Sequence, residues 1–271
     1  MSEDETGNPD SGGLRAWVSN VGDRIEFFIL WLGGIAEMFW HAVTRGPRKP
    51  IGYHDIAEQV VRLGIRSIPL MALMSLFVGM ILAWQFGDAL ADFGAKNALG
   101  NVTSLALVQE LVPVILAVTV GTKMATGMTA ELGSMKVTEQ IDAIAALGAD
   151  PIKKLVWPRL VAATIAMPLL VAAGNVLAML GGMMIGESVF DVPGDYFYAT
   201  YIDELSPMDY ITSIVKAGTF GMITGLTGCY EGFQTKFGTE AVGQATTTTV
   251  ATLSVAVLVA DFALTALFVP V

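Results

Sequence analysis

The chain has 271 residues, of which 54% are hydrophobic and 15% are charged, and its formal net charge is −10. Soluble domains carry about 25% charged residues, and here the charges leave uninterrupted gaps at residues 67–87, 160–186 and 241–260. Because a helix needs about 20 apolar residues to cross the hydrocarbon layer, the composition excludes an ordinary soluble domain. It predicts an all-α integral membrane protein that crosses the bilayer several times.

Several other classes of protein are disfavoured by the same totals. The acidic residues gather in the N-terminal tail and in connections, where solvated charge explains them better than a surface for a basic partner, and no nucleic-acid binding is expected. One cysteine, Cys229, and two histidines allow no disulfide within the chain and no metal-ligand cluster. We therefore expect no metal site and no cofactor bound by the chain itself.

The N-terminal part is predicted to lie outside the hydrocarbon layer. Residues 1–24 begin with the acidic stretch MSEDETGNPDSGG, which is unlike a secretory signal, and are predicted to form a disordered tail. Residues 25–66 are predicted to hold an interfacial helix and a cytoplasmic linker. In that helix, at 25–43, polar and apolar positions fall on opposite faces: Glu26, Gly33, Glu37 and His41 against Phe28, Trp31, Leu32, Ile35 and Phe39. Such a helix lies at the membrane surface more readily than it spans, so a surface position is favoured over a sixth span.

The remaining residues, 67–271, are predicted to form the membrane domain. Its five predicted transmembrane helices run near 67–87, 104–122, 160–186, 210–230 and 246–268. With this assignment, 13 of the 15 Lys and Arg residues fall on the side of the N-terminus, whereas Lys96 alone falls on the far side and Lys216 falls inside a span. Connections rich in Lys and Arg stay in the cytoplasm, so the N-terminus is predicted to be cytoplasmic and the C-terminus to lie across the membrane.

Small residues form a stripe on two of the predicted spans. The third span carries Ala178, Gly182 and Gly186, and the fourth carries Gly218, Gly221, Gly225 and Gly228. Such stripes let helix backbones approach closely in lipid. At least one stripe is expected to pack within the subunit, and the other is left open as a contact in a homodimer.

Three ionisable residues are predicted to lie inside spans: Glu110, Lys216 and Asp261. Residues of this kind are costly in a membrane and mark functional sites by default. All three lie at a similar depth, roughly 10 Å from the end of their span at 1.5 Å per residue, so we predict one polar cluster. The alternative is a structural ion pair in which Lys216 extends towards the membrane surface.

The connection between the second and third spans is patterned like a soluble helix. An amphipathic helix is predicted to begin near Met128, with Gly148 as its C-cap and Pro151 preventing its continuation. Lys153 and Lys154 then mark the return to the membrane from the cytoplasm. The alternative is a re-entrant linker with a solvated face.

These residues resemble a known family. The stretch AELGSMKVTEQIDAIAALGADPIKKLVWPRLVA is similar to the cytoplasmic signature of the MlaE/YrbE-like permeases, the membrane subunits of bacterial lipid ABC transporters. Further stretches that resemble the family are LFVGMILAWQ, LVQELVPVILAVTVGTKMATGMTAELG, VKAGTFGMITGLTGCYEGF and AVGQATTTTV. The resemblance runs from about residue 50 to the C-terminus, with one departure: Gln109 stands where family members often have Arg.

The resemblance implies particular site residues. The cytoplasmic helix would be a coupling helix that docks on a separate ATPase through Glu131, Thr138, Glu139, Asp142, Gly148, Asp150 and Pro151. A cavity for phospholipid acyl chains would be lined by Leu82, Phe86, Ala89, Leu90, Phe93, Glu110 and Leu111, for which plain core packing is the alternative.

The resemblance also implies an assembly in the bacterial inner membrane. Two copies of the chain would associate with cytoplasmic ABC ATPase subunits, which bind ATP and Mg²⁺, and with a periplasmic MCE-domain protein, with room for a small STAS-type regulator. The chain has no GxxxxGK[ST] phosphate-binding motif, so we expect it not to be an enzyme by itself. The rival hypotheses are an ion-coupled secondary transporter that uses Glu110 and Asp261, a membrane-embedded enzyme and a non-transporting scaffold.

Overall fold

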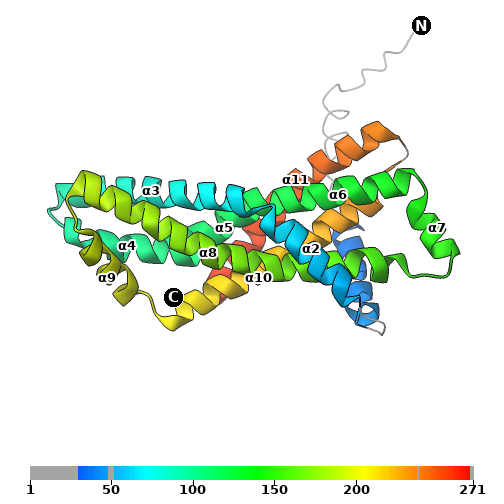
Figure 1. Cartoon of the computed structure of the whole chain (residues 1–271), viewed down its shortest axis with the longest axis horizontal. Coiled ribbons are helices and arrows are strands. Elements are labelled where there is room, and N and C mark those ends of the chain that lie inside the picture. The colour runs from blue at the N-terminus through cyan, green and yellow to red at the C-terminus, as the bar shows by residue number, and fades with distance from the viewer. Residues whose placement is uncertain (1–29, 48–51, 237, 269–271) are drawn as a thin grey trace, which may run out of the picture.

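The structure, a computed structural model, describes residues 30–47, 52–236 and 238–268, and in these ranges its regular structure is entirely helical. Long helices run side by side along the longest axis of the molecule (Figure 1). Two short helices, α7 (Gln140–Ala146) and α9 (Gly194–Glu204), lie at opposite ends of this bundle. The molecule is therefore an elongated bundle with a cap of short helical structure at each end.

Four helical segments are long and apolar enough to cross a membrane: α3 (Ile68–Asp92), the rod Lys96–Val137, the rod Ile152–Phe190 and α11 (Thr239–Phe268). They contain four of the five predicted spans. The fifth prediction corresponds to α10 (Pro207–Phe233), which is long enough but is not among the four. Buried polar residues lower its hydropathy, among them Thr212, Ser213, Lys216, Thr224 and Thr227. A fifth crossing by α10 stays a prediction.

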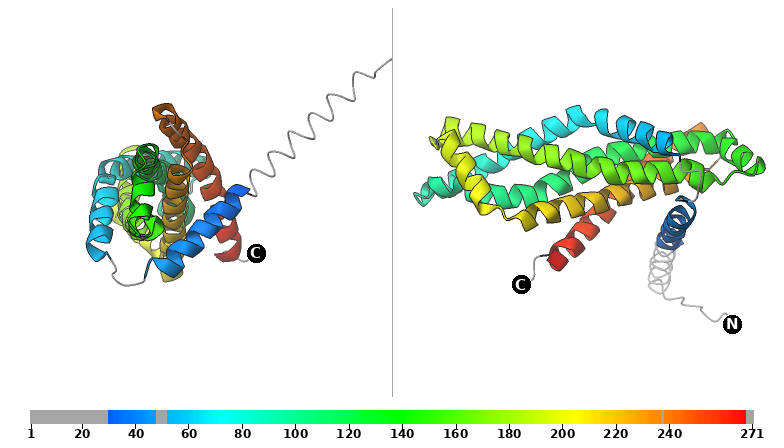
Figure 2. Two further views of the ribbon diagram at one scale, coloured as in Figure 1. Left: turned by 90° about the vertical axis from the view of Figure 1, so that its right-hand side faces the viewer. Right: turned by 60° about the horizontal axis from the view of Figure 1, so that its bottom comes forward.

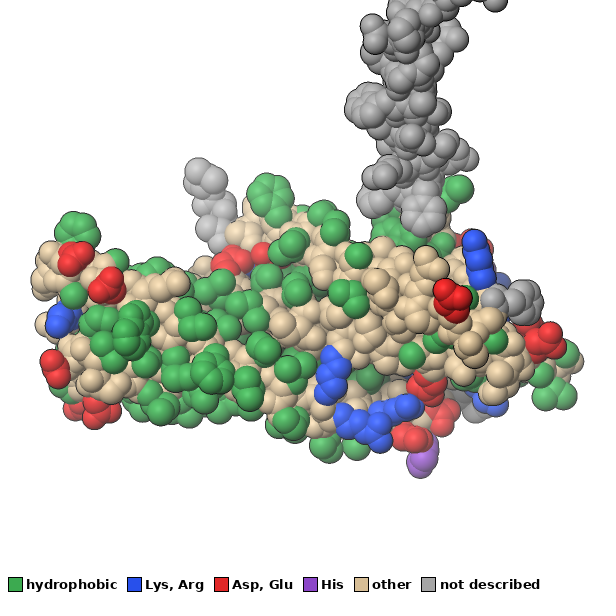
Figure 3. All heavy atoms as spheres, turned by 90° about the horizontal axis from the view of Figure 1, so that it is seen from above, with side chains coloured by type: hydrophobic (Ala, Val, Ile, Leu, Met, Phe, Trp, Pro, Cys, Tyr) green, Lys and Arg blue, Asp and Glu red, His purple; other side chains and the backbone are tan. Residues whose placement is uncertain are grey.

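Charged side chains gather towards the two ends of the bundle, and many hydrophobic side chains are exposed on the surface between them (Figure 3). Large apolar side chains are exposed on the membrane-spanning candidates, among them Phe77, Trp84, Leu169 and Phe262. An exposed apolar band of this kind is costly in water and favourable in lipid. The structure is that of a membrane protein.

The first of the two rods combines several helical types. It consists of η1 (Lys96–Ala98), α4 (Leu99–Leu105), η2 (Ala106–Leu111), α5 (Val112–Leu116), η3 (Ala117–Gly121) and α6 (Thr122–Val137). η2 and η3 are π-helical and flank Pro113. Such turns adjust the direction of the side chains on a helix and occur often at functional sites.

The two rods form the centre of the bundle. The second rod consists of η4 (Ile152–Val156) and α8 (Trp157–Phe190). α8 packs against α3, α10 and α2 (Tyr53–Ile65), and α6 packs against α10 and α11. In its most apolar stretch, the first rod has 44% of its residues buried and the second rod has 50%. The corresponding share for α11 is only 11%. α11 is therefore a peripheral helix, and it leans away from the others towards its C-terminal end (Figure 2).

Both stripes of small residues pack within the chain. A side chain added at Gly221 would overlap the Ala163 carbonyl of α8, and one at Gly228 would lie 2.8 Å from the Ala125 carbonyl of α6. On the third span, Gly186 faces Phe197 of α9. Neither stripe is free for a second copy of the chain, so the option of a homodimer contact through one of them is wrong.

The tightest of these approaches predicts a measurable effect on stability. Gly79 of α3 lies against the backbone of α8, where an added Cβ would overlap the Ala178 carbonyl. Gly79→Ala is expected to destabilise the protein by about 1–3 kcal/mol, because overpacking forces the backbones apart. Thermal unfolding in detergent measures this, and Gly243→Ala, at a helical glycine with nothing within 4 Å, is the matched control. An unfolding temperature unchanged by Gly79→Ala would contradict this packing.

The N-terminal predictions are only partly within the described ranges. The predicted tail at 1–24 and the first part of the predicted interfacial helix lie outside them. Residues 30–45 are helical, and this helix lies across the outside of the bundle (Figure 2), with Met38 and Ala42 buried. The predicted linker contains α2, which packs along α8. Whether the helix at 30–45 lies at the membrane surface stays a prediction.

Candidate functional site

Glu110, Lys216 and Asp261 meet inside the bundle, although they come from three different helices. The Nζ atom of Lys216 on α10 lies 2.7 Å from Oε2 of Glu110 on η2 and 3.1 Å from Oδ1 of Asp261 on α11. It also donates to the hydroxyl of Thr265 at 2.8 Å. The hydroxyl of Thr265 in turn donates to Oε1 of Glu110 at 3.1 Å. We call these four residues the polar cluster.

The burial of the polar cluster is uneven. The side chain of Lys216 is 1% exposed, whereas those of Glu110 and Asp261 are 33% and 18% exposed. A buried ammonium is stable only when its charge is paired and its donors are satisfied, and here two carboxylates and a hydroxyl do this. The cluster therefore ties α10 and α11 to the first rod around one cation. Its part in transport stays a prediction.

Gln109 continues this polar region towards one end of α10. Its side-chain amide donates to Oδ1 of Asp209 at 2.7 Å, and its backbone carbonyl lies 3.3 Å from Nζ of Lys216. Asp209 also accepts from the backbone N–H of Ser206 at 2.8 Å, as part of a capping box at the start of α10. Gln109 therefore links Asp209, at the start of α10, to Lys216 of the polar cluster: its side-chain amide bonds to the first and its backbone carbonyl to the second.

Some of the residues predicted to line a lipid cavity are buried or partly buried in the structure, and others are exposed. Leu82 is buried, and Phe86, Leu90 and Leu111 are partly buried against the core. Ala89 is exposed, and Phe93 is 85% exposed. None of these residues lines the hollows described below. Their place on a lipid path stays a prediction.

The segment predicted to couple to an ATPase has a different shape from the expected one. The predicted amphipathic helix does not begin near Met128, because α6 continues the first rod without interruption to Val137. Met128 and Leu132 are buried in the core, so packing within the bundle extends this rod past the point where charges begin. The break comes at Thr138 and Glu139, where Glu139 takes a left-handed conformation with φ of 59°.

The short helix α7 and the turn after it form the projecting end of the molecule. Gly148 follows α7 with φ of 78°, and the backbone N–H groups of Gly148 and Ala149 bond to the carbonyls of Ala145 and Ile144. This is the Schellman arrangement that ends a helix at a glycine, so the predicted C-cap is confirmed. Asp150 accepts from the backbone N–H of Ile152 at 3.0 Å, and the next helix begins at Pro151. We call residues 138–151 the coupling segment.

Most of the side chains proposed for docking are accessible on the coupling segment. Thr138 and Glu139 are exposed, and Asp142 is exposed and pairs with Lys136 at 3.0 Å. Asp150 lies 3.5 Å from Arg45. These groups present a surface of mixed charge beyond the end of the bundle.

Glu131 lies elsewhere and has a different environment. Its two carboxylate oxygens each pair with an arginine, Oε2 with Arg62 of α2 and Oε1 with Arg159 of α8, both at 2.9 Å. Arg159 is almost completely buried, with 6% of its side chain exposed. Glu131 thus joins three helices inside the subunit, and its predicted part in docking an ATPase stays untested. A signal in the sequence could have indicated this group of three charged residues. Arg62, Glu131 and Arg159 all lie at the predicted cytoplasmic ends of their helices, and they carry opposite charges.

A large apolar groove lies between the helix at 30–45, α10 and α11. Its volume is about 540 Å³, and its walls include Trp31, Ile35, Ile223, Leu226, Val255 and Val259. The indole N–H of Trp31 donates to Glu231 of α10 at 2.7 Å. A smaller hollow of about 430 Å³ lies beside Thr126 of α6 and Thr247 of α11. The sequence pattern indicated neither hollow, since no local spacing brings these helices together.

Comparison with known families identifies the class of protein. A model of the family described as Permease MlaE matches residues 56–267, which is well over half of the chain. The chain belongs to the MlaE permease family. The resemblance seen in the cytoplasmic stretch and in the predicted spans is thereby confirmed.

Relatives of this MlaE-family chain are similar over nearly its whole length. A protein of Rickettsia felis named "Probable ABC transporter permease protein" is 34% identical over 250 residues, covering 92% of this chain and 96% of the relative. The Haemophilus influenzae protein "Intermembrane phospholipid transport system permease protein MlaE" is 30% identical over 252 residues, covering 93% and 97%. The Arabidopsis thaliana protein "TRIGALACTOSYLDIACYLGLYCEROL 1, chloroplastic" is 31% identical over 240 residues, covering 88% and 69%.

The polar cluster of this MlaE-family chain includes one member that the sequence interpretation missed. Thr265 lies one helical turn after Asp261, and its hydroxyl contacts both Glu110 and Lys216. The spacing of four residues places the two side chains on the same face of α11. Hydroxyl groups one turn from an intramembrane acid are therefore a usable signal for further members of such a cluster.

Proposed function

We propose that this chain is the permease subunit of an ABC transporter that moves phospholipids between the bacterial inner membrane and a periplasmic MCE-domain protein. The observation that carries the proposal is the match to the MlaE permease family over residues 56–267. It is supported by similarity to a Haemophilus influenzae permease whose name specifies intermembrane phospholipid transport, over 93% of this chain. The proposal puts the N-terminus in the cytoplasm and the C-terminus in the periplasm.

In this proposal, a separate ABC ATPase binds ATP and Mg²⁺ and docks on the coupling segment. The position of that segment supports the assignment, because it projects beyond the end of the bundle and joins the two central rods, Lys96–Val137 and Ile152–Phe190 (Figure 1). A push on it is transmitted to both rods, since α6 and α8 each pack along α10. Such movement would widen and compress a lipid path at the other end of the bundle, near Phe86, Phe93 and Glu110.

Two copies of the chain form the translocation unit in this proposal. The open apolar face of α11 supports this, because Val255, Leu258, Val259 and Phe262 are all more than half exposed. The MCE-domain protein would continue the lipid path on the periplasmic side. A small STAS-type regulator would sit with the ATPase.

The experiment is lipid transfer by the chain reconstituted in liposomes with its cognate ABC ATPase and MCE protein. Transfer of a fluorescent phospholipid is expected only when the ATPase and ATP are both present. The polar cluster favours one alternative, an ion-coupled secondary transporter in which Glu110 and Asp261 carry protons. Transfer without any ATPase that a proton uncoupler abolishes would establish that alternative and refute the proposal.

A further inference from the structure

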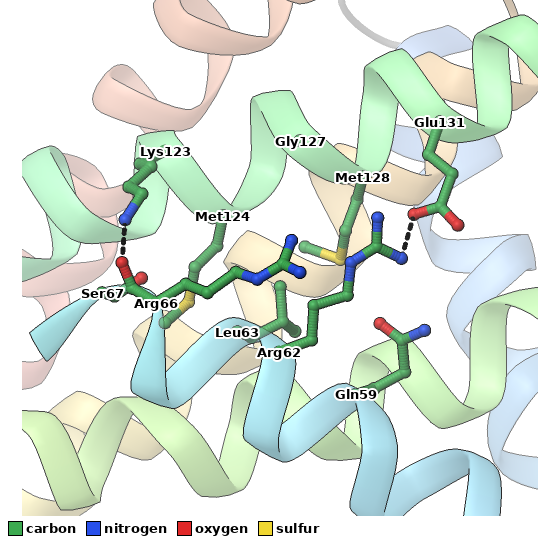
Figure 4. A pocket seen from close by; sticks show the side chains of 10 residues that line it. All are labelled: Gln59, Arg62, Leu63, Arg66, Ser67, Lys123, Met124, Gly127, Met128 and Glu131. Atoms are coloured by element: carbon green, nitrogen blue, oxygen red, sulfur yellow. Dashed lines mark hydrogen bonds and ion pairs between the residues drawn. The ribbon is translucent and has the colours of Figure 1, made fainter.

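A small basic pocket lies where the connecting helix α2 meets the start of α3, against the side of α6. Its volume is about 150 Å³. Figure 4 shows the side chains of Arg62 and Arg66 reaching into the same space between α2 and α6, with Lys123 at one end and Glu131 at the other. Met124 and Met128 form its apolar wall. We call this hollow the elbow pocket.

The cations of the elbow pocket outnumber its acids. Glu131 is the one acidic residue among the described residues that line it, and both of its oxygens are already paired, with Arg62 and Arg159. Within the described ranges, neither Arg66 nor Lys123 forms an ion pair with a carboxylate. The amine of Lys123 donates instead to the backbone carbonyl of Arg66. Among the residues that the structure describes, the side chains of Arg66 and Lys123 are therefore left without a carboxylate counter-ion.

Cations that lie close together repel each other, and an anion bound between them relieves the repulsion. The side chains of Arg62, which is paired with Glu131, and of Arg66 both line the pocket (Figure 4), and methionine side chains close one wall. A planar guanidinium and an ammonium are the groups that bind a phosphate oxygen most strongly. The arrangement therefore favours an anionic phosphate group between Arg66 and Lys123.

The position of the elbow pocket in the fold distinguishes a lipid from a soluble anion. Arg66 and Ser67 directly precede α3, whose first residue, Ile68, begins a segment that can cross the membrane. Ile65 and Ile68 beside the pocket are 58% and 45% exposed. A phosphate held here has an apolar helix surface next to it, along which acyl chains can lie. Basic residues at such a boundary attract anionic lipids.

We propose that the elbow pocket binds the phosphate of an anionic phospholipid, with Arg66 and Lys123 as its ligands. The lipid links α2 to α6 and so fixes the connection between the N-terminal part and the membrane domain. This site lies at the opposite end of α3 from Leu90 and Phe93, so it is separate from the proposed transport path. Binding of the lipid does not depend on the proposed function. The orientation proposed above would put the elbow pocket at the inner leaflet of the membrane, and only this placement rests on that proposal.

The test is native mass spectrometry of the full-length chain purified in detergent. Phosphatidylglycerol and phosphatidylcholine with the same acyl chains are added at equal concentration. The wild type is expected to retain phosphatidylglycerol about thirtyfold more than phosphatidylcholine, since Arg66 and Lys123 each add about 1 kcal/mol of attraction near the surface and about 1.4 kcal/mol corresponds to a factor of ten. The double variant Arg66→Gln, Lys123→Gln is expected to lose this preference and to retain the two lipids about equally.

Two controls keep the result specific. Lys153→Gln with Lys154→Gln removes the same charge from residues that do not line the pocket and is expected to keep the preference. The conservative pair Arg66→Lys with Lys123→Arg keeps the charge and is expected to keep it as well, which separates lost binding from lost folding. Retention of phosphatidylglycerol by the Arg66→Gln, Lys123→Gln protein at the wild-type level would overturn the proposal. So would displacement of the lipid by inorganic phosphate at equal concentration, which would assign the pocket to a free anion.

Discussion

Lys216→Met is expected to lower the free energy of unfolding in detergent by about 3–5 kcal/mol, because it leaves two half-buried carboxylates facing each other without a cation. Lys216 is 1% exposed and contacts both Glu110 and Asp261. Methionine has a similar length and no charge, so the packing volume is nearly kept and the electrostatic change dominates. Chemical or thermal unfolding followed by circular dichroism measures the loss.

The same cluster offers an internal check on the cause. In the Lys216→Met background, Glu110→Gln is expected to restore part of the lost stability, since one of the two repelling charges is gone. In the wild-type background, Glu110→Gln is expected to destabilise, since it removes a partner of Lys216. The matched control is Lys154→Met at an exposed lysine, for which a change within about 0.5 kcal/mol is expected. Equal effects of Glu110→Gln in both backgrounds would show that the charges are not coupled.

The polar cluster could be predicted from the sequence because depth along a span is nearly a linear function of residue number. Three ionisable residues at similar depth in apolar helices have few partners other than one another, and the structure brings Glu110, Lys216 and Asp261 together. The direction in which each side chain points is a different matter. The π-helical turn at Ala106–Leu111 changes the angular position of Glu110, and no feature of the sequence specifies such a turn.

In the residues that lead into the coupling segment, tertiary packing overrides the local sequence pattern. The residues from Met128 to Val137 carry charges and small side chains, which favour a new helix at the membrane surface. In the structure they extend the first rod, because Thr129 bonds to the Gly228 carbonyl of α10 and Leu132 is buried. The end of the segment was predictable since Gly148 and Pro151 act through their own backbone geometry. Its beginning depends on contacts with a helix about a hundred residues away.

The same distinction explains the two stripes of small residues. Their spacing predicts close approach of a partner helix, and the structure has that approach at Gly221 and Gly186. The identity of the partner is not a property of the stripe. Ala163 of α8 and Phe197 of α9 provide it from within the chain. Among the four candidate spans, α11 has the smallest buried share, 11% of its most apolar stretch.

Glu139→Lys is expected to reduce the amount of ATPase that co-purifies with the chain by at least about tenfold, because it reverses the charge that the coupling segment presents to its proposed partner, and a charge of the wrong sign at an interface costs several kcal/mol. Glu139 is exposed at the corner between α6 and α7, so the substitution changes the surface of the coupling segment and leaves the core unchanged. Lysine accepts the left-handed backbone at this residue about as well as glutamate does. Co-expression with the cognate ABC ATPase, affinity purification through the permease and quantification of the bound ATPase measure the effect.

The decisive comparison for this prediction is a charge reversal of the same size at the other end of the bundle. Glu187 is exposed near the C-terminal end of α8, and Figure 1 shows α9 at that end of the bundle. Glu187→Lys is expected to leave the amount of bound ATPase unchanged. Glu139→Gln, which removes the charge without reversing it, is expected to fall between the wild type and Glu139→Lys. If Glu139→Lys binds the ATPase and supports ATP-dependent lipid transfer as well as the wild type, the coupling segment is not the docking surface. In that case the force that moves the two central rods must enter the bundle elsewhere.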